Sequence, residues 1–187
     1  VCGDTGIQMK NGGNNLIKKC DSYGNYDYKT LSDGAADYGG NADGFADKQH
    51  KGAPNSYIGC RAWDNSDDGW DFFQRKGGSS VLIDCICYNN GPATFDMTLN
   101  PRATGVDKAW FDALEGTQVV DRHGVTRTVR IKEYINLGNG NGFKLGGDRT
   151  NHTVQLSGCL SVGNTVRGFE HNNNAGEMRI YNCSAYD

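Results

Sequence analysis

Aspartates crowd around two copies of an Asp-Gly-aromatic motif in the stretch 41–72. Asp43-Gly44-Phe45 returns 25 residues later as Asp68-Gly69-Trp70, and Asp67 and Asp71 flank the second copy. Carboxylates held close together repel each other unless a cation lies among them. Ca²⁺, a hard cation that takes about six to eight oxygen ligands, suits such a set. The four aspartates therefore predict a calcium site; the alternative is ordinary turn aspartates that face solvent.

The elements that would position these aspartates belong to a repeat with a period near 25 residues. An Asn follows a Cys by five residues at Cys20, Cys60, Cys85 and Cys159, and Tyr134 stands in the same relation to Asn139. Three or four residues past the Asn comes a second landmark, namely Gly69-Trp70, Thr94-Phe95, Gly142-Phe143 and Gly168-Phe169. Gly44-Phe45, after an insertion at 26–41, and Gly6-Ile7 complete a set of six pairs. Units of such short strands cannot bury their own apolar faces, so they must stack. We therefore predict an all-β fold, a parallel β-helix (solenoid) with coils of about 25 residues.

Alignment of the coils predicts which residues are neighbours in space, because equivalent residues of adjacent coils lie about 4.8 Å apart. It makes Asp43 and Asp68 neighbours, and it places Lys144 two coils, or about 10 Å, from Asp71, with room for a sugar ring between them. A solvated surface lysine is the alternative. The alignment predicts an inward column of Phe45, Trp70, Phe95, Phe143 and Phe169, and an outward column of Ala46, Asp71, Asp96, Lys144 and Glu170.

Other features of the repeat are predicted to be structural. The cysteines form an inward column of free thiols without the spacing of a zinc site, and a disulfide among the seven stays open. Each Asn of its column bonds the backbone of the next coil at a tight bend. Two segments exceed the coil pattern, 26–41 and 97–127, and within the second, 106–116 predicts a short helical excursion ending at Gly116.

Composition excludes several classes of function. The net charge of −3 and the pI near 5.8 indicate no nucleic-acid partner, and no apolar run approaches the ~20 residues of a membrane span. The sequence starts without methionine or a signal peptide. We therefore expect residues 1–187 to be a single β-helix domain, a truncated or processed piece of a longer catalytic domain. We expect a monomer, although exposed strand edges of the end coils would permit self-association.

Four stretches in this order resemble polysaccharide lyase family 9: NADGFADK (41–48), CRAWDNSDDGWDFF (60–73), GNGNGFKLGG (138–147) and GFEHNNNAGEMRIYNCSAY (168–186). The resemblance implies a right-handed parallel β-helix and a secreted or periplasmic enzyme acting on an acidic plant-type polysaccharide, polygalacturonate or rhamnogalacturonan. It also implies that Lys144 is the catalytic base and that the essential Ca²⁺ is held by Asp43, Asp67, Asp68 and Asp71.

The implied reaction is a β-elimination, in which Lys144 removes the C5 proton of a uronic acid and the C4–O bond breaks. The base must be neutral, and we expect nearby Ca²⁺ and Arg149 to lower its pKa. Weaker candidates for binding substrate carboxylates, each with a plain surface charge as its alternative, are Arg149, Lys132, Arg167 and Lys48. His123 and His152 are weaker candidates for acids, and Asp27, Asp33 and Asp37 for a second Ca²⁺ site.

Two other functions remain open on the sequence. The solenoid could be a non-catalytic, Ca²⁺-stabilised module that binds glycans or mediates adhesion. It could also be a metal-independent glycoside hydrolase that uses two of Asp67, Asp68 and Asp71 as its acid and base. The sequence does not choose between a homogalacturonan and a rhamnogalacturonan backbone, or between endo and exo action.

Overall fold

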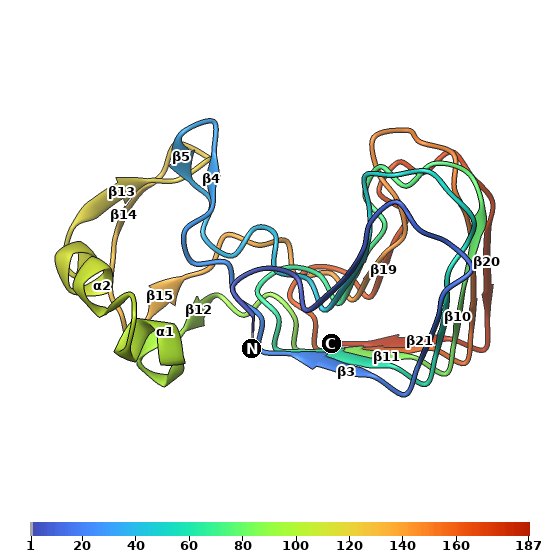
Figure 1. Cartoon of the computed structure of the whole chain (residues 1–187), viewed down its shortest axis with the longest axis horizontal. Helices are drawn as coiled ribbons and strands as arrows, with labels where there is room; N and C mark the ends of the chain where they lie inside the picture. Colours follow the sequence, from blue (N-terminus) through green and yellow to red (C-terminus); the bar gives the residue numbers. More distant parts are fainter. Residues whose placement is uncertain (1) are drawn as a thin grey trace.

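The computed structural model describes residues 2–187, and its main body is a parallel β-helix (Figure 1). Each coil contributes one strand to each of three five-stranded parallel sheets. The first sheet contains β1 (Ile7–Met9), β6 (Phe45–Asp47), β9 (Trp70–Asp71), β16 (Phe143–Lys144) and β19 (Phe169–Glu170). The second contains β2 (Leu16–Lys18), β7 (Ser56–Ile58), β10 (Ser79–Ile83), β17 (Thr153–Ser157) and β20 (Met178–Tyr181). The third contains β3 (Asp21–Tyr23), β8 (Arg61–Trp63), β11 (Ile86–Tyr88), β18 (Leu160–Val162) and β21 (Ser184–Tyr186).

Stacked aromatic rings form the core behind the first sheet. The centroid of Trp70 lies 4.6 Å from that of Phe45 and 4.9 Å from that of Phe143, and Phe143 continues to Phe169 at 5.2 Å. The inward column predicted from the repeat is therefore confirmed at these four positions. Such stacked rings bury a large apolar area and hold neighbouring coils in register. The residue after each ring points outward, and so Lys144 pairs with Asp71 across the sheet.

The residue before each ring must be glycine, for a steric reason. A Cβ on Gly69 would lie 2.5 Å from the carbonyl oxygen of Gly142 in the next coil, and one on Gly142 would lie 2.7 Å from that of Gly168. Contacts this short are repulsive, so the close approach of the coils depends on the missing side chain. This requirement explains the Gly-aromatic landmark of the sequence.

The cysteine column lies in the core and the asparagine column links neighbouring coils, as expected. All seven cysteines are free thiols, and Cys60, Cys85 and Cys159 are buried in the core. The asparagine amides form a ladder: Asn25 donates to Asn65 (2.7 Å), Asn65 to Asn90 (2.9 Å) and Asn90 to Asn164 (2.8 Å). Asn139 is not in this ladder, contrary to the expectation. Its backbone N–H donates to Asp67 instead.

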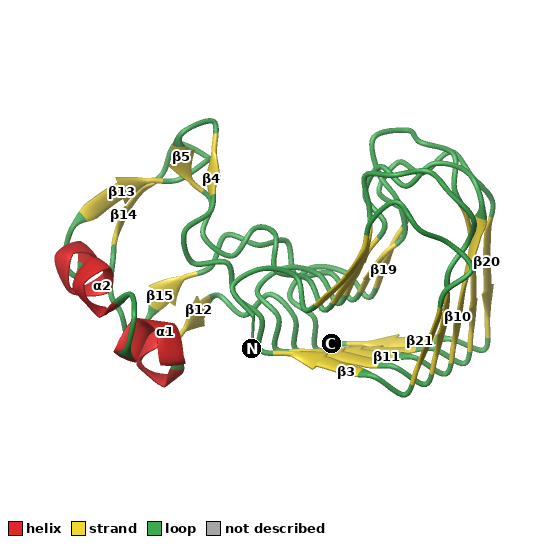
Figure 2. Cartoon of the chain, viewed as in Figure 1, coloured by secondary structure: helices red, strands yellow, loops and turns green. Residues whose placement is uncertain are grey.

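Two long insertions leave the β-helix on one side and pack against each other (Figure 2). The first, near 26–41, forms the hairpin of β4 (Leu31–Ser32) and β5 (Ala35–Ala36). The second, between Gly91 and Gly140, contains β12 (Thr94–Phe95), η1 (Met97–Leu99), α1 (Pro101–Thr104), α2 (Lys108–Leu114), β13 (Gln118–Val120), β14 (Thr126–Thr128) and β15 (Tyr134–Ile135). Both contribute to a second hydrophobic cluster, made of Tyr26, Tyr28, Ala36, Tyr38, Met97, Ala103, Phe111, Val129, Tyr134 and Leu137.

The expected coil at Thr94-Phe95 is wrong. Strand β12 pairs antiparallel with β15, so Phe95 lies opposite Tyr134, and Trp70 pairs directly with Phe143. Phe95 packs on Tyr26 of the first insertion at 4.6 Å rather than on the aromatic stack. Thr94 carries a Cβ atom, and the close approach of the coils requires glycine at this position. The repeat therefore has five coils rather than six, and the second insertion is longer than 97–127.

The predicted helix at 106–116 is confirmed as α2 (Lys108–Leu114), and Gly116 follows it with a φ of 78°. Glycine adopts this left-handed conformation without strain, which favours the end of a helix there. Asp96, expected in the outward column, instead accepts a hydrogen bond from the backbone N–H of Thr98 at the start of η1. Within residues 2–187, none of the helices combines the length and the apolar character needed to cross a membrane.

Candidate active site

Three of the four predicted aspartates converge beside the first sheet. Asp43 and Asp68 each precede the glycine of their coil, and Asp71 follows the buried ring of Trp70 in β9. One carboxylate oxygen from each lies within 4.8 Å of the other two, and all three residues are at most 2% exposed. The alignment of coils therefore gathers these side chains as the sequence predicted.

The fourth, Asp67, is buried next to the cluster but is turned differently. Its Oδ1 accepts a hydrogen bond of 2.6 Å from the backbone N–H of Asn139, in the segment that returns from the second insertion. Burial, and next the charge of Asp68, raise the pKa of Asp67 well above its ordinary value. Asp67 thus borders the group formed by Asp43, Asp68 and Asp71 without being one of the three that converge.

Two lysines are paired with the aspartates. The Nζ atom of Lys144 lies 2.9 Å from Oδ2 of Asp68 and 3.6 Å from Oδ1 of Asp71. The Nζ atom of Lys48 lies 2.7 Å from Oδ2 of Asp43 and 3.1 Å from Oδ2 of Asp71. The predicted separation of about 10 Å between Lys144 and Asp71 is wrong, because no coil lies between β9 and β16. No room for a sugar ring exists between them.

Burial and charge shift the pKa values of this group strongly. Burial raises the pKa of Asp43 to about 7, against the opposing effect of Lys48. Burial by itself lowers the pKa of Lys144, but the carboxylates of Asp68 and Asp71 outweigh it and raise the pKa above the ordinary value. We expected nearby Ca²⁺ and Arg149 to lower this pKa; the carboxylates rather than Arg149 dominate it here, and the lowering by Ca²⁺ stays a prediction. Lys144 is therefore held protonated while its ion pairs persist.

The donor set fits a hard divalent cation. It consists of carboxylate oxygens only, and four aspartates face two lysines, which leaves an excess of negative charge in a buried place. Oxygen ligands at several positions are what Ca²⁺ requires. Within residues 2–187, Asp43, Asp68 and Asp71 are the one group of three such side chains that converges closely enough to hold a metal ion.

The cluster opens into a pocket of about 430 Å³ that both insertions help to form. Lys48, Asp67, Asp71 and Lys144 line it from the β-helix, together with Gln49 and Phe73. Its other walls are formed by Thr30, Leu31, Ser32, Asp37, Gly40, Asn41, Arg122 and Asn139. Arg122 was missed by sequence reasoning, because it comes from an insertion that has no register with the coils.

The remaining predicted residues lie elsewhere. Arg149 is exposed in the turn after β16, and Arg167 pairs with Glu170 at 2.8 Å. Lys132 lines a separate hollow in the second insertion, beside Arg130 and Glu115. None of these three cations lines the pocket of Lys144, whereas Lys48, the fourth weak candidate, is part of the aspartate cluster.

The two histidines also lie outside the cluster. His152 is buried and stacks on Phe72 with the ring centroids 5.5 Å apart, and its Nδ1 lies 2.9 Å from the carbonyl oxygen of Gly77. His123 follows Arg122 in the second insertion, and its Nε2 accepts a hydrogen bond of 3.2 Å from the Nε of Arg122. Neither histidine lines the pocket of Lys144.

This chain is similar to known proteins in structure and in sequence. A solved structure described as the crystal structure of pectate lyase Pel9A superposes with a TM-score of 0.66 at 31% identity, covering 95% of this chain and 34% of that one. Pectate lyase L of Dickeya dadantii (strain 3937) is 32% identical over 184 residues, and pectate lyase PEL9 of Emericella nidulans is 29% identical over 206 residues. These matches cover 98% of this chain, but only 33% and 39% of the two relatives.

The family model described as "Pel9A-like, right handed beta helix region" matches residues 1–107, which is more than half of the chain. The match and the structural superposition confirm the right-handed parallel β-helix expected from the sequence. This chain therefore belongs to the Pel9A-like right-handed β-helix family of the pectate lyases.

Proposed function

We propose that this chain carries the active site of a calcium-dependent pectate lyase, which cleaves uronic-acid-containing pectic chains by β-elimination. The observation that carries the proposal is the buried group of Asp43, Asp68 and Asp71 with Lys144 beside it, opening into one pocket. The names of the relatives, which are pectate lyases, support the same reaction class. We further propose a secreted or periplasmic enzyme that acts as a monomer.

Asp43, Asp68 and Asp71 would hold the calcium ion, with Asp67 at the border of the site. When bound there, Ca²⁺ would supply positive charge against the carboxylates of the cluster and against the carboxylate of a uronic acid. The acidity of C5 depends on that charge, because removing the C5 proton builds negative charge on the adjoining carboxylate. The aspartates therefore set the place at which a sugar can react.

Lys144 would act as the base. Its neutral amine takes the proton from C5, the C5–H electrons form the C4–C5 double bond, and the C4–O bond breaks. The departing oxygen takes a proton from solvent, and one fragment is left with an unsaturated sugar at its end. Lys144 must first leave its ion pairs with Asp68 and Asp71, because these carboxylates raise its pKa.

The test is the ultraviolet absorbance of the unsaturated product from polygalacturonate, measured with calcium and with a chelator. Wild type is compared with Lys144→Ala and Lys48→Ala, since both lysines line the pocket. We expect chelator to abolish turnover, and Lys144→Ala to lower kcat by at least about a hundredfold. Far-ultraviolet circular dichroism checks that each variant is folded.

Each alternative outcome has a definite meaning. Turnover that persists in chelator, or a fully active Lys144→Ala variant, overturns the proposed mechanism. Loss of activity in Lys48→Ala with full activity in Lys144→Ala would show that the reaction requires Lys48 and not Lys144. A saturated product would indicate hydrolysis, and binding without any turnover would indicate a glycan-binding module.

A further inference from the structure

Arg122 brings a second cationic group to the pocket of Lys144. It lies in the turn between β13 and β14 of the second insertion, and its side chain is 25% exposed. The pocket is thus bounded on one side by the β-helix with its aspartates and on the other by Arg122, Asp37 and the β4–β5 hairpin. A guanidinium in such a place can bind a carboxylate through two parallel hydrogen bonds.

The neighbouring groups leave part of Arg122 free to bind a ligand. Its Nη1 donates to Oδ2 of Asp37 (3.2 Å), its Nη2 to the carbonyl oxygen of Leu137 (3.1 Å), and its Nε to His123. A guanidinium carries five N–H donors, so these three bonds do not use them all. One N–H on each of the two terminal nitrogens is left unused, and a carboxylate can bind to a guanidinium through both of these nitrogens.

Asp37 offers an unused acceptor next to those donors. Its Oδ1 lies 3.1 Å from Nη1 of Arg122, yet it is buried and has no aligned hydrogen-bond donor. A buried carboxylate oxygen without a donor is costly, and it is stabilised when a ligand or a water molecule donates a hydrogen bond to it. A hydroxyl group entering the pocket would supply that donor. Arg122 and Asp37 together thus match a sugar that carries both a carboxylate and hydroxyl groups.

The backbone around Arg122 is held rigidly. The Oδ1 atom of Asp121 accepts from the backbone N–H groups of His123 and Val125 at 2.9 Å, and its Oδ2 pairs with Arg127 at 2.6 Å. The backbone N–H of Arg122 donates to the carbonyl oxygen of Ala36 in β5 at 3.0 Å. The two insertions are therefore tied together directly at the pocket, and Arg122 needs little ordering on binding.

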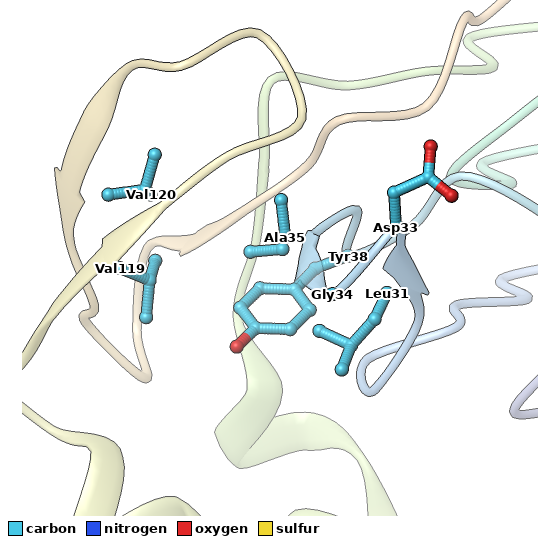
Figure 3. Close-up of a pocket in the computed structure, with 8 residues that line it drawn as sticks. Leu31, Asp33, Gly34, Ala35, Tyr38, Val119 and Val120 are labelled. Atoms are coloured by element: carbon cyan, nitrogen blue, oxygen red, sulfur yellow. The ribbon is translucent and has the colours of Figure 1, made fainter.

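The neighbouring hollow does not have this chemistry. It lies between the β4–β5 hairpin and β13, has a volume of about 480 Å³, and is lined by Leu31, Asp33, Gly34, Ala35, Ala36, Tyr38, Val119 and Val120 (Figure 3). Asp33 is its one charged lining residue, and Figure 3 shows its carboxylate pointing away from Val119 and Val120. A polyanion therefore has no cationic group to bind there.

We propose that Arg122 and Asp37 form a second sugar-binding subsite, which holds a uronic acid other than the one cleaved beside Lys144. Arg122 binds the carboxylate of that sugar, and Asp37 accepts a hydrogen bond from one of its hydroxyls. This inference rests on the proposed function for the identity of the ligand as a pectic chain. It assigns to the two insertions, which contribute none of the converging aspartates, the task of selecting an acidic substrate.

The experiment compares wild type with Arg122→Gln, Arg122→Lys and Asp37→Asn on polygalacturonate and on its methyl ester. The matched control is Arg130→Gln, an exposed arginine of the same insertion that pairs with Glu115 at 3.4 Å outside the pocket. We expect Arg122→Gln to raise KM for polygalacturonate about ten- to a hundredfold with little change in kcat. Arg122→Lys should recover only part of the loss, because it lacks the planar fork. The control should leave KM unchanged.

Binding separates this inference from the proposed function. Titration of oligogalacturonate into wild type and Arg122→Gln in chelator, where turnover is not expected, reports the subsite without the reaction. If wild type cleaves the polymer and Arg122→Gln has the same KM and the same affinity as wild type, the proposed subsite alone is overturned. If Arg122→Gln binds oligogalacturonate more weakly than wild type, but wild type never yields the unsaturated product, the subsite is supported and the proposed lyase reaction is overturned. A wild type that neither binds nor cleaves overturns both.

Discussion

Lys144 and Asp68 form a buried ion pair between neighbouring coils, with Nζ 2.9 Å from Oδ2. The pair exists because the second insertion leaves the β-helix and returns without adding a coil, so that β16 lies directly beside β9. It links the predicted base to a predicted metal ligand. Charge balance in this group should therefore decide both the stability and the activity of the protein.

Removing the amine of Lys144 should destabilise the protein in chelator. Lys144→Met keeps most of the side-chain volume but leaves the buried carboxylate of Asp68 without its lysine, while Asp71 keeps only Lys48, at an expected cost of about 3–5 kcal/mol in the free energy of unfolding. Urea unfolding measures this cost. The exposed pair of Lys108 and Asp112 supplies the control, Lys108→Met, which should cost less than about 1 kcal/mol. Equal costs for the two variants would show that the buried pair is unimportant.

Calcium should stabilise the folded protein. A ligand present at a hundred times its dissociation constant adds about 2.7 kcal/mol to the free energy of unfolding, so the melting temperature should rise in calcium relative to chelator. Asp68→Asn should greatly reduce this rise, since Asp68 is one of the three converging aspartates. Asp33→Asn, an exposed residue of the first insertion, should leave it intact. A wild type that melts at the same temperature in both conditions contradicts the calcium site.

Arg75 should be among the residues most important for stability. It is 0% exposed, its Nη2 donates to the carbonyl oxygens of Gly52 (3.2 Å) and Ala53 (2.8 Å), and its Nε lies 3.0 Å from Oδ1 of Asp47. Arg75→Met leaves the carboxylate of Asp47 buried without this cation, with an expected loss of about 3–5 kcal/mol in urea unfolding.

The control for Arg75 is Arg179→Met, which breaks an exposed pair with Glu177 and should cost less than about 1 kcal/mol. The turn that Arg75 bonds follows Lys48 and Gln49, two residues that line the pocket. Arg75→Met should therefore also disturb substrate binding. A variant as stable as wild type would show that the bonds of Arg75 contribute little.

His152 should make stability depend on pH. Burial lowers its pKa in the folded state, so below the unfolded value of ~6.5 the unfolded chain binds the proton more readily than the folded one. The contribution of His152 to stability is thus complete above ~6.5 and is lost as the pH falls through the interval down to the folded pKa. His152→Gln should flatten this part of the pH profile of the unfolding free energy. Identical profiles for the two proteins would contradict the prediction.

The columns of the β-helix were predictable because stacking makes equivalent positions neighbours. Phe45, Trp70 and Phe143 stack in consecutive coils, and the same alignment gathered Asp43, Asp68 and Asp71. The coil at Thr94 was predicted wrongly because only the spacing was used. The missing glycine was the available signal, since the close approach of the coils excludes a Cβ at that position.

Arg122 and Asp37 could not be placed from the sequence. They lie 85 positions apart in two insertions without a common period, and their contact depends on how these insertions pack around the second hydrophobic cluster. Likewise, the sequence predicted Lys48 only as a weak candidate for binding substrate carboxylates, because a repeat does not specify the direction in which a long side chain folds back. In the structure it reaches both Asp43 and Asp71.

The sequence by itself determined the solenoid and the neighbourhood of Asp43, Asp68 and Asp71, since a repeat of glycine, aromatic and asparagine positions aligns the coils in which all three landmarks are present. Tertiary structure alone decided the distance from Lys144 to the acids, the presence of Lys48 among them and the wall that carries Arg122. These depend on where a chain of irregular insertions returns to the helix. The place of return depends on the burial of apolar surface between segments that are distant in sequence, and no repeat in the sequence specifies which of these segments pack together.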